Sequence, residues 1–115
     1  MKEMRTEIEY KGTTFNLVFD LNVMEEIQDE YGTLDEWGKL TDGSTGEPNA
    51  KAVIFGFTAM LNEGIDIDNE EKGLNLKPFT HKQVGRILTE IGLREATLKM
   101  NKTVVESTKS EEKNV

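Results

Sequence analysis

The first twenty residues alternate apolar and polar side chains on both sides of a glycine, and this pattern predicts a β-hairpin. Lys11 and Gly12 are expected to form its two-residue turn. The turn type stays open, because lysine is a less favourable first turn residue than asparagine or aspartate. A slip of one residue would turn every side chain over, so the turn and the apolar pattern agree on one register. The expected pairs on the apolar face are Ile8 with Phe15 and Thr6 with Leu17.

After the hairpin the apolar spacing becomes that of a helix. Asn22 followed by Glu25 is the pattern of a helix N-cap, and Gly32 is expected to end this helix as an αL cap. Thr33 and Glu36 repeat the start pattern, so a second short helix is expected directly afterwards. The apolar residues of the two helices are Val23, Met24, Ile27, Tyr31, Trp37 and Leu40.

The middle of the chain predicts a loop, a central helix and a second loop. Residues 41–49 are rich in turn formers and are expected to connect two helices. Residues 50–63 are apolar on almost every side, which is typical of a helix at the centre of its domain. Residues 64–78 alternate apolar with polar side chains. We interpret them as an acidic loop with a few anchoring side chains, in preference to a small second hairpin.

Two further helices are expected in the C-terminal third. Thr80 and Gln83 form a capping-box pattern, and Gly92 is expected to end that helix. A last helix should begin near Leu93, with Leu93, Ala96, Met100 and Val104 on its inner face. Residues 1–108 are expected to form a single globular domain, and residues 109–115 a flexible tail. The predicted fold class is therefore α+β and mostly helical, with an N-terminal β-hairpin packed on four to five helices.

Composition and charge narrow the functional classes. The 115 residues carry 22 acidic and 14 basic side chains, a net charge of −8. Such a surface repels phosphate groups, so neither nucleic acid nor an anionic membrane is an expected partner. The start of the chain lacks the apolar core of a signal peptide, and no stretch approaches the ~18 apolar residues of a membrane span. We therefore expect a cytoplasmic protein.

No catalytic, cofactor-binding or metal-binding residues are predicted. Asp66 and Asp68 match two positions of an EF-hand loop, but the required glycine is Glu71 and the final acid is Lys77. His81 is the only histidine, and no convergent partner is discernible around it. The absence of cysteine excludes disulfides and thiolate chemistry. The protein is therefore not expected to be an enzyme or to need a cofactor.

Three aromatic residues are candidates for contact with a partner protein. They are Trp37, the sole tryptophan, and Phe55 and Phe57 on the expected central helix. The rings of Phe55 and Phe57 point to different sides of that helix, so one of them could be exposed. Aromatic side chains dominate protein interfaces, which makes an exposed ring informative. The commoner alternative is a core filled from two sides, by the hairpin and by the later helices.

Three stretches carry a resemblance to a known family. Residues 10–37 read Y-K-G-T-T-F-N-L-V-F-D-L-N-V-M-E-E-I-Q-D-E-Y-G-T-L-D-E-W, residues 51–64 read K-A-V-I-F-G-F-T-A-M-L-N-E-G, and residues 78–86 read P-F-T-H-K-Q-V-G-R. Together with the last helix, they resemble the tail assembly chaperones of long-tailed bacteriophages, found in phages and prophages of Gram-positive bacteria. The resemblance covers most of the chain and lies in its overall pattern, without a catalytic motif.

This resemblance implies a function in building phage tails. Members of the family bind the tape-measure protein, keep its hydrophobic helices soluble and recruit subunits of the tail-tube protein. They act in the host bacterial cytoplasm and are left out of the finished virion. The resemblance assigns no contact residues, and self-association stays open as a further interaction.

A second interpretation is a small acidic prophage-encoded adaptor or regulator that acts by protein–protein contact. Gene position separates the two, because a tail chaperone gene should lie between the tail-tube and tape-measure genes. A hydrolase or metal-dependent enzyme is disfavoured, since the sequence contains no discernible nucleophile–base pair or ligand set.

Overall fold

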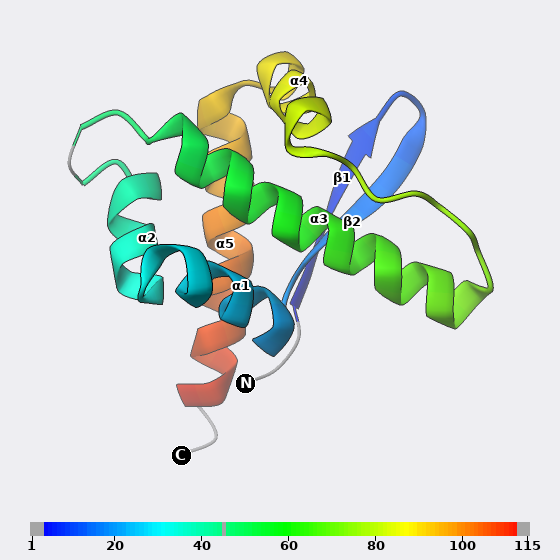
Figure 1. The fold of residues 1–115 in the computed structure, drawn as a ribbon, viewed down its shortest axis with the longest axis horizontal. Coiled ribbons are helices and arrows are strands. Elements are labelled where there is room, and N and C mark those ends of the chain that lie inside the picture. Colours follow the sequence, from blue (N-terminus) through cyan, green and yellow to red (C-terminus); the bar gives the residue numbers. More distant parts are fainter. Residues whose placement is uncertain (1–3, 45, 113–115) are drawn as a thin grey trace.

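Within the residues that the structure describes, 4–44 and 46–112, a two-stranded antiparallel sheet packs on five helices (Figure 1). This computed structural model confirms the predicted α+β, mostly helical fold. The elements are β1 (Met4–Tyr10), β2 (Thr13–Phe19), α1 (Leu21–Tyr31), α2 (Leu34–Thr41), α3 (Ala50–Lys72), α4 (His81–Ile91) and α5 (Leu93–Glu112). α3 runs across the middle of the molecule and contacts β2 and each of the other helices, so it is the central helix that the sequence predicts.

The predicted register of the hairpin is confirmed. Ile8 lies opposite Phe15, with the turn at Lys11 and Gly12. Both turn residues have positive φ angles, 51° and 78°, as a type I′ turn requires. The mirror-image turn matches the twist of the two strands, which compensates for the lysine at its first position. The second predicted pair is also confirmed, with Thr6 opposite Leu17.

The C-terminal half of β2 anchors the hairpin in the core. Leu17, Val18 and Phe19 are all fully buried, so this part of the strand is covered on both faces. β2 contacts both α3 and α5. Phe15 is only half-buried, and its ring meets that of Phe79 edge-on, with 5.4 Å between the ring centres. The apolar face of the hairpin therefore belongs to the core at one end and approaches the surface at the turn.

Most predicted helix boundaries are confirmed, and one helix cap is corrected. Thr33 and Thr80 cap α2 and α4 as predicted, the latter with a complete capping box. The cap of α1 is Asp20, whose carboxylate accepts a hydrogen bond from the Val23 amide at 3.1 Å. Asn22 lies inside the first turn, because the extended strand leads directly into the helix at Asp20. Gly32 and Gly92 end α1 and α4 as predicted. The backbone of Gly32 lies outside the αL region that was expected for it.

The predicted loop over residues 64–78 is wrong in its first half. α3 continues through Gly64 to Lys72 and ends at Gly73, which has αL backbone angles. Gly64 lies in the helix because β2 passes against it, and a Cβ atom there would collide with the backbone carbonyl group of Asn16. This glycine therefore permits close packing of helix on strand and does not end the helix. Only residues 73–80 connect α3 to α4 outside regular structure.

The last helix begins at Leu93, as predicted. Of its four predicted inner residues, Ala96 and Met100 are buried and Val104 is half-buried. The fourth, Leu93, is 37% exposed. Leu93 is exposed because it is the first residue of the helix and lies beyond the contact with the core. The backbone of residues 109–112, part of the predicted tail, is helical, and residues 113–115 lie outside the described part of the chain.

Gly64→Ala should lower the free energy of unfolding by roughly 1–3 kcal/mol, because the new Cβ meets strand backbone that cannot move aside alone. Gly38→Ala in α2 is the matched control. Its Cβ would meet nothing within 4 Å, so the better helix former should stabilise the protein by up to about 1 kcal/mol. Urea unfolding followed by circular dichroism measures both. Equal midpoints for the two variants would contradict the close contact of α3 with β2.

Candidate functional site

The three aromatic candidates for partner contact occupy different positions. Trp37 and Phe57 are buried in the core, so neither is available to a partner in this structure. The indole N–H of Trp37 donates to the backbone carbonyl of Ala52 at 3.0 Å, and its ring fills the space left by Gly56. Phe55 is half-buried and reaches the surface. The core alternative is therefore the one that fits Trp37 and Phe57.

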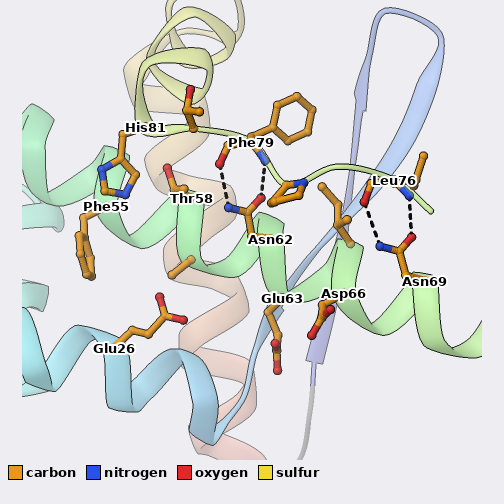
Figure 2. A pocket seen from close by; sticks show the side chains of 14 residues that line it. Glu26, Phe55, Thr58, Asn62, Glu63, Asp66, Asn69, Leu76, Phe79 and His81 are labelled. Atoms are coloured by element: carbon orange, nitrogen blue, oxygen red, sulfur yellow. Dashed lines mark hydrogen bonds between the residues drawn. The ribbon is translucent and has the colours of Figure 1, made fainter. Parts of the chain in front are cut away.

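Phe55 lies in an open groove along one face of α3, which we call the α3 groove. α3 forms its floor and α1 forms one wall (Figure 2). The other wall is the connecting segment 73–80, which we call the strap, together with the first turn of α4. The hollow has a volume of about 540 Å³. Its floor residues recur at helical spacing: Phe55, Thr58, Ala59, Asn62, Glu63, Asp66 and Asn69.

Two asparagines of α3 hold the strap by its backbone. The side-chain amide of Asn62 donates to the carbonyl oxygen of Phe79 at 2.9 Å and accepts from the Phe79 amide at 2.8 Å (Figure 2). Asn69 makes the same pair of hydrogen bonds with Leu76, both at 3.0 Å. The asparagines are seven residues apart, so two helical turns place them on one face. Both backbone groups of two strap residues are thereby satisfied, and the wall of the groove is held in place.

Carboxylates gather where the groove lies over the C-terminal half of α3. Glu63 and Asp66 lie on its floor, and Glu26 comes from α1. A hydrogen bond with the side chain of Asp20 and partial burial raise the pKa of Glu63 to about 7, although the Asn22 amide donates to it at 3.0 Å. The negative charges of Asp20 and Asp66 also contribute to this raised pKa. Glu63 is therefore partly protonated near neutral pH.

Phe55 and His81 also line a second, adjoining hollow with a different charge, and we include both hollows in the α3 groove. The lining of this second hollow includes Ile54 and two basic residues, Lys51 and Lys82, with Glu30 as the acidic member. Lys51 lies in the first turn of α3 and Lys82 in the first turn of α4. One end of the groove is therefore acidic, and the other carries a small excess of positive charge.

His81 is an exposed residue of the first turn of α4. Its ring packs edge-on against Phe55, with 5.8 Å between ring centres, and Tyr31 packs against the same phenylalanine at 5.5 Å. Asp66 and Asp68, considered above as EF-hand positions, lie on the continuous helix α3 and not on a loop. Across the described residues, no three histidine or acidic side chains are arranged to hold a metal ion.

The groove contains residues that sequence analysis did not select. They come from one face of α3 and the facing side of α1: Asn62, Asn69, Glu63 and Glu26. No family model, curated protein or solved structure matches this chain. None of the described helices is long and apolar enough to cross a membrane. The groove is thus the feature from which a function is inferred.

The two asparagine pairs predict a pattern of amide hydrogen exchange in the strap. The amides of Leu76 and Phe79 should exchange at least roughly tenfold more slowly than those of Asn75 and Lys77. The reason is that the Leu76 and Phe79 amides donate hydrogen bonds to asparagine side chains. Asn69→Ala should remove the protection at Leu76 and preserve it at Phe79. Exchange measured by nuclear magnetic resonance tests both. Uniformly fast exchange along residues 74–79 would contradict a clamped strap.

The raised pKa of Glu63 predicts that stability falls as pH rises. Its folded pKa of about 7 lies above the ordinary glutamate pKa of 4.5. The folded state is therefore favoured below pH 4.5, and that contribution is lost as pH rises toward 7.

Glu63→Gln should remove this decline and make the variant more stable than the parent at pH 8, because the glutamine cannot ionise. Thermal unfolding between pH 4.5 and 8 measures the effect. Glu26→Gln is the control, since it removes a groove carboxylate outside the Glu63 hydrogen bonds and should keep the decline. A parallel profile for Glu63→Gln and the parent would refute the assignment.

Proposed function

We propose that this protein is a tail assembly chaperone of a long-tailed bacteriophage or prophage. It binds the tape-measure protein, keeps its hydrophobic helices soluble in the host cytoplasm, recruits tail-tube subunits and is absent from the finished virion. The sequence resemblance supports this function. The structural observation that supports it is the α3 groove, an open surface in which apolar side chains such as Phe55 and Phe79 lie among polar and charged ones.

The shape of the groove suits a ligand that is itself a helix. Its floor extends from Lys51 to Asn69, roughly 27 Å at about 1.5 Å per residue. A partner helix of about five turns fits this length. Helices bound in this way place an apolar stripe against the groove, with anchors three, four and seven residues apart. A long helical protein exposes such stripes before it assembles, and covering them is what a holding chaperone does.

The charge of the protein fits the same function. With a net charge of −8, the chaperone keeps a strongly charged surface in water while an apolar segment is covered. Repulsion between such complexes opposes their aggregation. The same charge disfavours nucleic acid and anionic membranes as direct partners.

The second candidate is a small acidic adaptor or regulator. It is favoured by the same groove, which would accept an amphipathic helix from another partner. Both candidates act by binding and not by catalysis. The position of the gene distinguishes them, because a location between the tail-tube and tape-measure genes is expected only for the chaperone.

Co-expression tests the proposed function directly. A tape-measure segment that is insoluble alone should appear mostly in the soluble fraction when this protein is made in the same cell, because its apolar helices are covered. The soluble material should contain both proteins after affinity purification through a tag on the segment. An insoluble control protein unrelated to phage tails should stay insoluble. If the tape-measure segment also stays insoluble while the chaperone is folded, the proposed function fails.

A further inference from the structure

We propose that the α3 groove binds an amphipathic helix that runs antiparallel to α3, with basic residues in its N-terminal half and acidic residues in its C-terminal half. This inference rests on the proposed function for the source of the helix, a segment of the tape-measure protein. Three observations carry it: the adjacency of the two hollows, the distribution of charge along them, and the direction of the helices that line them.

The two hollows of the groove adjoin at Phe55 and His81, which line both of them. A single elongated ligand that passes over Phe55 can therefore reach both hollows. Apolar side chains that reach the surface are present on the floor and on the strap wall: Ile54, Phe55, Pro78 and Phe79. A helix lying along this path can bury an apolar stripe against these side chains.

The charged side chains differ between the two ends. Among the described residues, the hollow over the C-terminal half of α3 is lined by Glu26, Glu63 and Asp66 and by no lysine or arginine. The hollow over the first turn of α3 contains Lys51 and Lys82. A ligand of complementary charge is basic at the first end and acidic at the second.

The acidic end also gains more from a basic ligand than an ordinary acidic surface would. Asp20 and Asp66 oppose the ionisation of Glu63 in the free protein. An ammonium or guanidinium group placed among these carboxylates would offset their mutual repulsion. A basic side chain is therefore favoured at this end over a neutral polar one.

Helix dipoles set the direction of the ligand. Its N-terminus carries partial positive charge and is favoured at the acidic end, near Asp66. Its C-terminus then lies near Lys51 and Lys82, where α3 and α4 begin with their own partially positive ends. α1 ends on this side with Tyr31 and opposes them, but two helix starts and two lysines outweigh one helix end. Since α3 runs from Lys51 toward Asp66, the bound helix is antiparallel to it.

Synthetic peptides test the charge order. Two peptides of about 18 residues share one apolar stripe and one composition, and differ in whether lysines fill the N-terminal half and glutamates the C-terminal half, or the reverse. The lysine-first peptide should bind the full chain roughly tenfold more tightly, as measured by fluorescence anisotropy, and lose affinity with added salt. Helicity of the free peptides cannot produce this result, because the helix dipole favours the glutamate-first order in isolation. Equal affinities, or no binding of either peptide, would overturn the proposal.

Charge exchange in the protein should reverse the preference. A variant with Glu26→Lys, Asp66→Lys, Lys51→Glu and Lys82→Glu keeps the net charge, and all four side chains are exposed. It should bind the glutamate-first peptide more tightly than the lysine-first one. The control exchanges two exposed charges on α5, Glu95→Lys and Lys102→Glu, and should keep the original preference. An unchanged preference in the groove variant would overturn the assigned ends.

A measurement on the unmodified protein tests direction independently of any variant. A spin label on the N-terminus of the lysine-first peptide should broaden the amide resonances of Asp66 and Asn69 more than those of Lys51 and Lys82. Stronger broadening at the lysines would overturn the antiparallel arrangement. A groove filled by a second copy of the chain, seen as a dimer that the peptide does not dissociate, would overturn the assigned occupant.

Failure of this inference is distinguishable from failure of the proposed function. If the parent and the charge-exchanged variant rescue a tape-measure segment equally well, the chaperone function holds and the assigned groove is wrong. If the parent does not rescue the segment but binds the lysine-first peptide in the stated direction, the groove is correctly assigned and its source of ligand is wrong.

Discussion

The close contact between α3 and β2 at Gly64 determines where the other elements lie. Without a side chain at this position, the helix axis approaches the strand until the backbone of Asn16 fills the space of the missing Cβ. Leu17 and Phe19 then enter the core beside the buried residues of α3. The same approach lets α3 continue past the hairpin to Lys72, because the helix crosses the strand without interruption. The floor of the groove is the part of α3 that this crossing leaves between α1 and the strap.

The strap depends on that continuation. In a connection such as residues 73–80, the backbone N–H and C=O groups have no partner in a helix or sheet and normally form hydrogen bonds with water. Here Asn62 and Asn69 supply a donor and an acceptor each, as a neighbouring strand would. The wall of the groove is therefore attached to its floor by paired hydrogen bonds, and a binding surface made partly of loop acquires a defined shape. If α3 ended at Gly64, the second asparagine would have no fixed position.

The sequence predicts the elements that rest on local patterns and misses those that rest on contacts between distant segments. The register of the hairpin follows from alternation and turn, and the caps at Thr33 and Thr80 follow from short-range hydrogen bonding. From the sequence, Gly64 resembles a helix end. The structure shows that glycine is needed there because the backbone of Asn16, 48 residues earlier, packs against it. The sequence does not show that Asn62 and Asn69 lie on one helical face, because this depends on α3 extending through both residues. Trp37 is conspicuous in the sequence as a rare aromatic, yet the space beside Gly56 buries it.

The side chains that fit their surroundings least well lie mainly along the groove. Phe55 keeps part of a large apolar ring in water, and Asp20 and Asp66 oppose the ionisation of Glu63. The buried hydroxyl of Tyr31 has no hydrogen-bond partner. Burial and the charge of Glu30 raise the pKa of that tyrosine as well. Each feature lowers the stability of the free chain, whereas the hairpin and the helix caps agree with their surroundings. Such exceptions are expected where a surface is shaped for a ligand and not for the isolated fold. Because Phe55 touches Tyr31 and lies in the same groove as Glu63, the three exceptions border a single surface, and that surface is the one a partner would cover.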